Sequence, residues 1–363
     1  MHAVIAGGGS AGHIEPALAF ADALRRRDPA AQVTALGTER GLDTRLIPAR
    51  GYDLVLIPPV PVPRRPGLEL LRVPGRLRRA VAAAATVLRE RDADVVVGFG
   101  GYVSAPAYLA ARQVGVPIVV HEANPRPGWA NRLGARLTTY VATTFPGTPI
   151  RHGRLLGLPI RRSISTLDRA ATRSSARAHF GLEPQPPALL VFGGSQGARR
   201  LNEAASGAAA GLRAAGVQVL HSTGAAHTVE VADPGASPPY VALPYLERMD
   251  LAYAAADLAL CRSGANTVVE LTALGLPAAY VPLPIGNGEQ ALIAAPVVAA
   301  GGGLMVPDPA CTPGWVLETL APLLTDAERL ATMGRAAAGQ GRPDADERLV
   351  DLALEAVRTR RRS

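Results

Sequence analysis

Short apolar runs alternate with longer stretches rich in alanine and leucine along the first third of the chain. The apolar runs predict strands at 2–6, 32–36, 53–57, 95–98 and 117–121, and the longer stretches predict helices at 15–27, 77–91 and 105–114. Strands that alternate with helices in this way are typical of βαβ units, in which helices join parallel strands. The pattern therefore predicts an α/β fold with a doubly wound parallel sheet.

The same pattern begins again near residue 188. The run "ALLVF" at 188–192 is followed by the glycine-rich "GGSQGARR" and a helical stretch, and further strands are expected at 217–222, 241–243, 258–261, 278–281 and 303–306. Two openings of strand, glycine loop and helix predict two Rossmann-like domains that face a cleft, with ligands beyond the carboxyl ends of the strands. We expect domains at 1–160 and 161–340, and a C-terminal helix with a basic tail at 341–363 that packs back on the first domain.

Composition narrows the class of protein. The 363 residues, 48% of them hydrophobic, are enough for two domains with sizeable cores. No apolar run reaches the roughly 18 residues that span a bilayer, and the N-terminus enters a strand without the basic segment of a signal peptide, so we expect a cytoplasmic location. The two cysteines, Cys261 and Cys311, argue against a disulfide framework or a thiolate metal site.

Charge suggests an anionic partner. The net charge of +8 rests on arginine, because the chain contains no lysine, and it favours a nucleotide, a nucleic acid or an anionic membrane. Aromatic residues are only 4% of the chain, too few for many base-stacking platforms, so we expect no nucleic-acid binding. Residues 64–79, "RRPGLELLRVPGRLRR", place six arginines among apolar side chains. Such a segment can lie on anionic lipid, although a solvated charged face is the alternative.

The first glycine loop carries the most suggestive chemistry. Gly7, Gly9 and Gly12 spell G-x-G-x-x-G after a strand, and Pro16 suits the first turn of the helix that we expect to follow, so the loop should face a phosphate. A nicotinamide cofactor also needs an acidic residue at the end of the second strand, where none stands. His13 follows the loop at once, and a near-neutral imidazole suits removal of a proton from a sugar hydroxyl. The alternative is a structural or merely exposed histidine.

Polar side chains follow other predicted strands. Glu122 and Asn124 are expected at a strand end, where they can bond hydroxyl groups; alternatively Asn124 caps the next helix. Ser195 in the second glycine loop suits a phosphate, or the N-cap of its helix. Glu270 is expected to accept hydrogen bonds from the hydroxyls of a ribose, and Gln290 lies near the start of a later helix. For both residues the alternative is a side chain on a solvent-exposed surface without a ligand.

Taken together, these motifs resemble the MurG family of glycosyltransferases, which make lipid II in peptidoglycan synthesis. The resemblance covers roughly residues 3–355, with spellings typical of actinobacterial members, and rests on "GGGSAGHIEPALA", "GFGGYVSAP", "HEANPRPGWANR", "GLPIRRSI", "GGSQGARRLNE", "YLERMDLAYAAADL", "CRSGANTVVEL" and "GLPAAYVPLP…GNGEQ". It implies the GT-B arrangement, with an N-terminal domain for the acceptor and the membrane and a C-terminal domain for the UDP-sugar.

The resemblance also implies an activity and its partners. These are inverting transfer of N-acetylglucosamine from UDP-N-acetylglucosamine to lipid I, an undecaprenyl-diphosphate acceptor, without a metal or other cofactor. The enzyme would lie on the cytoplasmic face of the cell membrane, held through residues 64–79, and serve cell-wall synthesis and cell division beside other cell-wall proteins.

Site residues are carried over by position. His13 is the expected base for the acceptor's C4 hydroxyl. The expected binding residues are Ser10, Ala11 and Gly12 near the acceptor diphosphate and donor sugar, Asn124 and Gln290 at the N-acetylglucosamine, and Arg161, Ser195, Leu246, Ala265, Asn266, Thr267, Val268, Val269 and Glu270 at UDP.

Several positions depart from the family pattern. Ser10 replaces a frequent threonine, Leu158 a frequent asparagine and Asn266 an apolar residue, while Ile293 stands where the family usually carries asparagine. These departures leave two alternatives open. One is a paralogue that glycosylates another lipid or a natural product, and the other is a peripheral membrane protein that binds a UDP-sugar without catalysis.

Overall fold

The computed structural model divides the chain into two compact units. Unit 1 comprises residues 1–161 and 343–363, and unit 2 comprises residues 162–342. The structure describes residues 1–39, 41–60, 72–194, 197–231, 235–285 and 287–360. No helix in these ranges is both long and apolar enough to span a membrane.

Unit 1 contains a seven-stranded, all-parallel sheet in the order β3-β2-β1-β4-β5-β6-β7. Its strands are β1 (His2–Gly7), β2 (Gln32–Gly37), β3 (Asp53–Leu56), β4 (Val95–Gly100), β5 (Ile118–Glu122), β6 (Val141–Thr143) and β7 (Gly153–Leu155). Its helices are α1 (Ala11–Arg27), α2 (Asp43–Ala49), α3 (Val73–Glu90), α4 (Ser104–Val114), α5 (Trp129–Gly134) and α16 (Ala345–Arg360).

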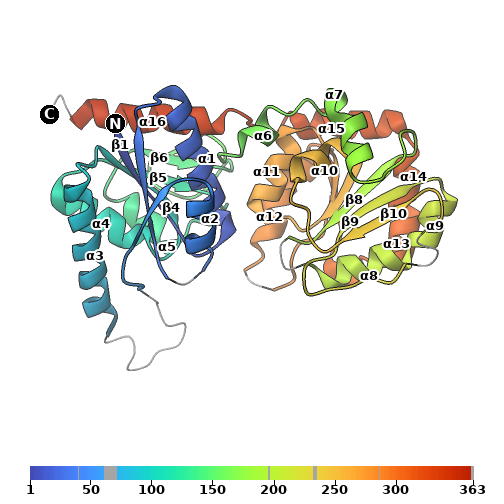
Figure 1. Ribbon diagram of the computed structural model, residues 1–363, viewed down its shortest axis with the longest axis horizontal. Helices are drawn as coiled ribbons and strands as arrows, with labels where there is room; N and C mark the ends of the chain where they lie inside the picture. The colour runs from blue at the N-terminus through green and yellow to red at the C-terminus, as the bar shows by residue number, and fades with distance from the viewer. Residues whose placement is uncertain (40, 61–71, 195–196, 232–234, 286, 361–363) are drawn as a thin grey trace. The chain divides into compact units, whose positions relative to one another are not determined.

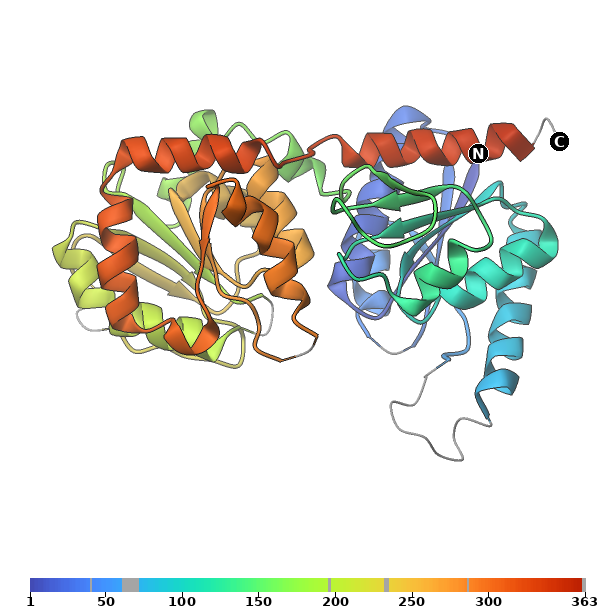
Figure 2. The ribbon, with the colours of Figure 1, turned by 180° about the vertical axis from the view of Figure 1, so that it is seen from behind.

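Helices cover both faces of this sheet because its strands are apolar on both sides. In β1, Ala3 and Ile5 pack against α1 and α16, whereas Val4 and Ala6 pack against α3 and α4. Figure 1 shows α3 beside α4, and Figure 2 shows α16 along the outside of the same unit. The C-terminal helix therefore completes the core of the N-terminal unit.

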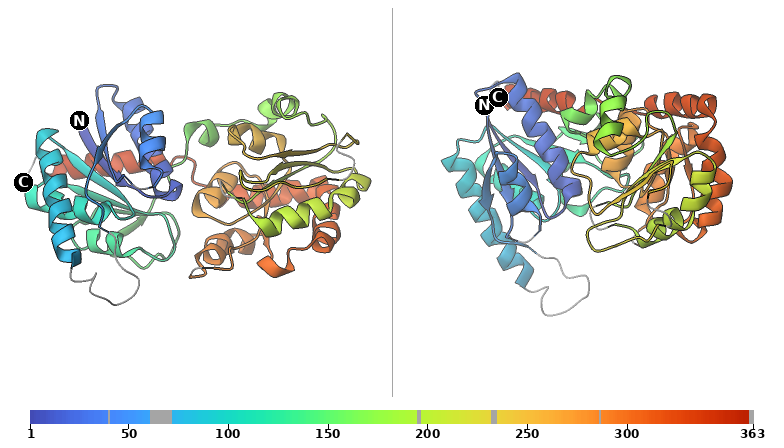
Figure 3. Two further views of the ribbon diagram at one scale, coloured as in Figure 1. Left: turned by 60° about the horizontal axis from the view of Figure 1, so that its bottom comes forward. Right: turned by 45° about the vertical axis from the view of Figure 1, so that its right-hand side comes forward.

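Unit 2 repeats this plan of a parallel sheet between helices (Figure 3). Its sheet has six strands in the order β10-β9-β8-β11-β12-β13. Its strands are β8 (Ala188–Phe192), β9 (Gln218–Ser222), β10 (Tyr240–Leu243), β11 (Leu258–Cys261), β12 (Ala278–Tyr280) and β13 (Gly303–Met305). Its helices are α6 (Arg162–Ser165), α7 (Arg169–His179), α8 (Arg199–Gly207), α9 (Ala209–Ala214), α10 (Met249–Ala255), α11 (Ala265–Ala273), α12 (Glu289–Ala299), α13 (Pro313–Trp315), α14 (Ala321–Leu324) and α15 (Ala327–Ala338), with a 3₁₀ turn at Asp308–Ala310 and a π-helical turn at Val316–Leu320.

The predicted α/β class and doubly wound parallel sheets are confirmed, and every predicted strand matches an observed strand within two residues at each end. One prediction about the first helix is wrong. Helix α1 begins at Ala11, within the glycine motif, rather than after it, so Pro16 lies in the second turn of the helix instead of the first. The cost of an interior proline is offset by the apolar face of this helix, on which Ile14, Leu18 and Phe20 are fully or almost fully buried.

Two buried histidines make the fold sensitive to acid. His121 in unit 1 bonds the carbonyl of Gly157 at 2.8 Å, and His221 in unit 2 bonds Tyr240 at 2.8 Å and Asn202 at 3.0 Å. Burial lowers the pKa of each histidine to about 4. In the unfolded state a histidine binds a proton below about pH 6.5, whereas in the folded state these two bind one only below about pH 4. Between these pH values the unfolded state binds more protons than the folded state, so the free energy of unfolding falls as the pH is lowered.

We therefore expect the titration of each histidine to lower the free energy of unfolding by up to about 3 kcal/mol as the pH falls from 7 to 4. Urea unfolding at several pH values, followed by circular dichroism, measures this loss. The His221→Gln variant should be less stable than the wild type at pH 7 yet lose less stability on acidification. An equal loss in both proteins would contradict this assignment.

Candidate functional site

The first glycine loop joins β1 to α1 and places His13 in the first helical turn. Gly9 adopts a φ of +89°, a left-handed conformation that favours glycine. Ser10 is the N-cap, and its carbonyl accepts the N–H groups of His13 and Ile14, each at 3.1 Å. Ala11 and Gly12 therefore form the positive N-terminal end of α1, the kind of position that binds phosphate.

The imidazole of His13 lies between the loop and the end of β4. Its Nδ1 is 3.2 Å from Oγ of Ser10, and a Cβ added to Gly100 would be 3.2 Å from its Nε2. Burial lowers the pKa of His13, while a hydrogen bond to the backbone of Gly8 and the charge of Asp43 raise it to a smaller extent. The ring is therefore mainly neutral at pH 7, as a base requires.

The neighbouring loop after β5 holds Asn124. The expected role of Glu122 as a ligand contact is wrong, because this carboxylate is buried and accepts the backbone N–H groups of Asn124 and Gly128 and the amide of Asn131 at 2.9–3.0 Å. The alternative of Asn124 as a helix cap is also wrong, since Gly128 caps α5. Asn124 is half-buried at the carboxyl end of β5, and Glu122 fixes its loop.

A cavity of about 300 Å³ adjoins the first glycine loop. It lies at the carboxyl ends of the strands, between the loops that follow β1, β2 and β4, the expected place for a ligand of a doubly wound sheet. Its lining is mostly apolar and includes Gly8, Gly9, Thr38 and the ring of Tyr102, which is 51% exposed. The basic segment at 64–79 is described only from residue 72, and its last residues begin α3 with Arg78 and Arg79 exposed.

Unit 2 places Glu270 on α11, just beyond the end of β11. The carboxylate accepts a hydrogen bond of 2.8 Å from the hydroxyl of Tyr253, which fixes its orientation. Ala265, Asn266 and Thr267 form the first turn of this helix, after the N-cap Gly264.

Three of the remaining expected UDP contacts offer only their backbone. The side chains of Leu246, Val268 and Val269 are buried, so only their main-chain groups can reach a nucleotide. Two buried polar atoms at the start of α11 have no hydrogen-bond partner among the described residues: Oγ of Ser263, just before the N-cap, and Oδ1 of Asn266, in the first turn. Because buried polar atoms are normally paired, these two fit a site that a polar ligand completes.

The other expected contacts are distributed as follows. Ser195 lies outside the described residues, and the N-cap of α8 is Ala198, so the N-cap alternative for Ser195 is wrong.

Gln290 is in the first turn of α12 and accepts the N–H of Leu283 through Oε1 at 2.9 Å. Arg161 is the last residue of the first part of unit 1, with its Nε 4.0 Å from Oε2 of Glu15. The apolar side chain of Ile293 is only 2% exposed, so it is not in contact with solvent.

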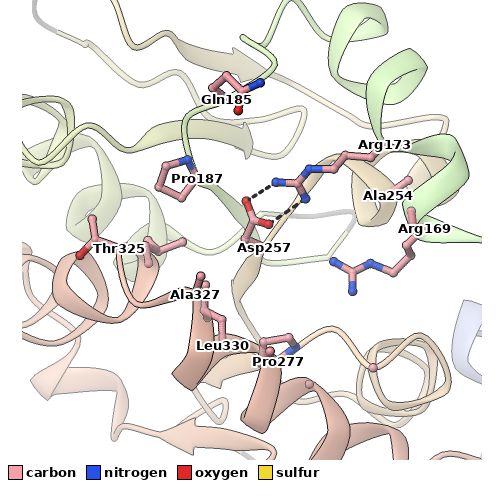
Figure 4. A pocket seen from close by; sticks show the side chains of 15 residues that line it. Arg169, Arg173, Gln185, Pro187, Ala254, Asp257, Pro277, Thr325, Ala327 and Leu330 are labelled. Atoms are coloured by element: carbon pink, nitrogen blue, oxygen red, sulfur yellow. Dashed lines mark hydrogen bonds and ion pairs between the residues drawn. The ribbon is translucent and has the colours of Figure 1, made fainter.

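A larger cavity, of about 750 Å³, opens at the amino ends of β8, β11 and β12 (Figure 4). There Asp257 pairs with Arg173 at 2.7 Å and with Arg177 at 2.9 Å. Arg169 donates to two backbone carbonyls at the end of α10. These groups hold α7 against α10 and β11, and ligands of such sheets bind at the opposite end. We therefore assign this cavity a structural role.

Comparison with protein families identifies both units. Residues 3–143 match the glycosyltransferase family 28 N-terminal domain, and residues 188–349 match the glycosyltransferase family 28 C-terminal domain. No group of three or more histidine, cysteine, aspartate or glutamate side chains within the described ranges is placed to hold a metal ion.

Individual proteins resemble the chain over its whole length. It is 60% identical over 363 residues, all of both chains, to the UDP-N-acetylglucosamine–N-acetylmuramyl-(pentapeptide) pyrophosphoryl-undecaprenol N-acetylglucosamine transferase of Streptomyces avermitilis. The enzyme of the same name from Mycolicibacterium smegmatis is 58% identical, with 99% of this chain and 95% of the relative covered. The crystal structure of Acinetobacter baumannii MurG superposes with a TM-score of 0.76 at 28% identity, covering 98% of this chain and all of that one. A UDP-GlcNAc 2-epimerase from Neisseria meningitidis, at 14% identity and a TM-score of 0.68, shares the fold alone, with 98% of this chain and all of that one covered.

Proposed function

Because the chain belongs to glycosyltransferase family 28 and, within it, to the MurG group, we propose that it transfers N-acetylglucosamine from UDP-N-acetylglucosamine to lipid I. The product is lipid II, the precursor of peptidoglycan. The observation that carries the proposal is the 60% identity to a relative whose name states this reaction, with the whole of both chains covered.

In this reaction His13 is the base. The C4 hydroxyl of the muramyl sugar attacks the anomeric carbon of the donor from the face opposite UDP, and Nε2 or Nδ1 of His13 takes the hydroxyl proton. The new glycosidic bond forms as the bond from the anomeric carbon to the phosphate oxygen of UDP breaks, so the configuration inverts. The half-buried position of His13 and its lowered pKa support this role.

The N-terminal end of α1, with Ser10, Ala11 and Gly12, faces the lipid-linked diphosphate and the donor sugar in this proposal. The adjoining cavity of about 300 Å³, with its apolar lining and Tyr102, supports an amphipathic acceptor there. Asn124 and Gln290 are the side chains that we propose contact the N-acetylglucosamine.

The donor nucleotide binds unit 2 at the carboxyl ends of its strands. Glu270 accepts hydrogen bonds from the ribose hydroxyls, the backbone at Leu246 holds uracil, and the N-terminal ends of α8 and α11 face the diphosphate. Arg161 supplies a positive charge near UDP. Fixed N–H dipoles stabilise the negative charge that develops on UDP as it leaves.

A transfer assay tests the function. Radiolabelled UDP-N-acetylglucosamine and a lipid I analogue are incubated with the folded protein, and labelled lipid product is expected. Donor binding without transfer would favour a non-catalytic UDP-sugar-binding protein. Transfer only to other lipids or natural products, in a panel of acceptors, would favour a paralogue.

We also propose attachment to the cytoplasmic face of the membrane through residues 64–79. Arg78 and Arg79 at the start of α3 are exposed and each is worth about 1 kcal/mol against an anionic surface. Their double replacement by glutamine should weaken binding to vesicles with anionic lipid roughly tenfold or more at low salt.

Co-sedimentation with the vesicles measures this effect. The matched control replaces two exposed arginines of α15, Arg329 and Arg335, with glutamine. An equal loss in both variants would show that net charge, rather than this segment, holds the protein on lipid.

A further inference from the structure

The Asp43 carboxylate lies beneath the first glycine loop, where sequence analysis placed no functional residue. Its side chain is completely buried, in the first turn of α2. Oδ1 accepts the backbone N–H of Gly9 at 2.7 Å, and Oδ2 accepts that of Thr38 at 3.0 Å. One buried charge therefore joins the loops that follow β1 and β2, through bonds that charge makes stronger than neutral ones.

The space around this carboxylate admits no side chain from the glycines that surround it. A Cβ on Gly8 would be 2.9 Å from Oδ2 of Asp43, and a Cβ on Gly37 would be 3.0 Å from its Cβ. Two further glycines lie directly against the backbone of the loop. A Cβ added to Gly41 would be 2.8 Å from the carbonyl oxygen of Gly9, and a Cβ added to Gly101 would be 2.5 Å from the carbonyl oxygen of Gly8. A side chain at any of these four positions would therefore displace the loop or the carboxylate.

The conformation of Gly9 determines where His13 lies, because α1 begins two residues later. The helix starts where the carbonyl of Ser10 accepts its first N–H groups, and the His13 ring lies at Oγ of Ser10, in the space that a side chain at position 100 would occupy. Asp43 is the charged side chain that acts on the His13 ring, together with the backbone of Gly8. A displaced Gly9 would therefore move the proposed base away from the end of β4.

We propose that Asp43 is a positioning residue for glycosyl transfer, which fixes the first glycine loop and thereby the orientation of His13. The inference rests on the proposed function. An aspartate in the first turn of a helix also stabilises that helix, so a structural role alone must be distinguished from positioning.

The test compares Asp43→Asn with Asp53→Asn, an exposed aspartate of the same unit that pairs with Arg91. The amide keeps the size of the side chain but can accept with only one of its two terminal atoms. We expect kcat to fall 10- to 100-fold and the KM for UDP-N-acetylglucosamine to stay within twofold. In the His13→Ala background the same replacement should lower kcat less than threefold, because the effects of two residues that act through the same interaction are not additive. Asp53→Asn should change none of these values.

Titration of the His13 ring by NMR, assigned through His13→Ala, gives a readout that does not need activity. Loss of the Asp43 charge should lower the pKa of His13. If Asp43→Asn fails to fold, Gly9→Ala strains the same loop at its positive φ without touching the carboxylate, and kcat should fall at least fivefold. Folded variants with an unchanged kcat and an unchanged His13 titration would overturn the proposal. If the wild type itself makes no product, the proposed function fails, and the titration still decides whether Asp43 acts on His13.

Discussion

Replacing His13 with alanine is expected to lower kcat at least 100-fold while the affinity for UDP-N-acetylglucosamine stays within twofold. General base catalysis typically contributes a factor of about 100 to 10,000, and the donor nucleotide is bound by unit 2 in the proposed scheme. Burial lowers the pKa of His13, so wild-type kcat should be constant near pH 7 and fall only below the ordinary histidine pKa of about 6.5. The variant should lack this acid limb.

Steady-state kinetics and calorimetric titration with the donor measure the two quantities. His152→Asn is the matched control, because this histidine of unit 1 is exposed and its φ of +61° suits asparagine. Turnover that survives in His13→Ala, with its acid limb intact, would remove His13 as the base.

The second large effect is expected at Glu270. Glu270→Gln should raise the dissociation constant for UDP roughly 10- to 100-fold, because a hydrogen bond to a charged group is worth about 1.5–3 kcal/mol. The amide can still accept the bond from Tyr253, so the fold of α11 should persist. Since ribose contacts are made before and during transfer, KM should change more than kcat.

Tyr253→Phe separates the carboxylate from its support. This variant keeps the charge of Glu270 and loses only the 2.8 Å bond that orients it, so its loss of affinity should be smaller. Calorimetry with UDP measures both variants. Wild-type affinity in Glu270→Gln would place the ribose elsewhere.

The repeating pattern of apolar runs was sufficient to predict the sheet of unit 2 and five strands of the sheet of unit 1, because strands buried on two faces are continuous apolar runs. β6 and β7 could not be predicted in this way. Each is three residues long, and β7, "GRL", contains a glycine and an arginine. They are strands because neighbouring strands extend the ladder to them.

The candidate site could be predicted only in part. Residues that follow strands, such as His13 and Glu270, are recognisable because strand ends gather at one edge of a parallel sheet. The role of Glu122 was mistaken because its partners, backbone N–H groups of its own loop, leave no sequence pattern. Asp43 was missed for the same reason, since its bonds depend on how two loops pack once β1 and β2 are paired.

The return of the chain to unit 1 has a consequence during synthesis on the ribosome. The first 161 residues emerge first, but Leu349, Leu352 and Ala353 of α16, which pack in the same core as α1, emerge only after unit 2. At roughly 5–20 residues per second this delay is about 10–40 s. The apolar surface of α1 that α16 later covers is exposed for that time. The unit translated first is thus completed last, and until α16 docks the exposed apolar surface of α1 is prone to aggregation.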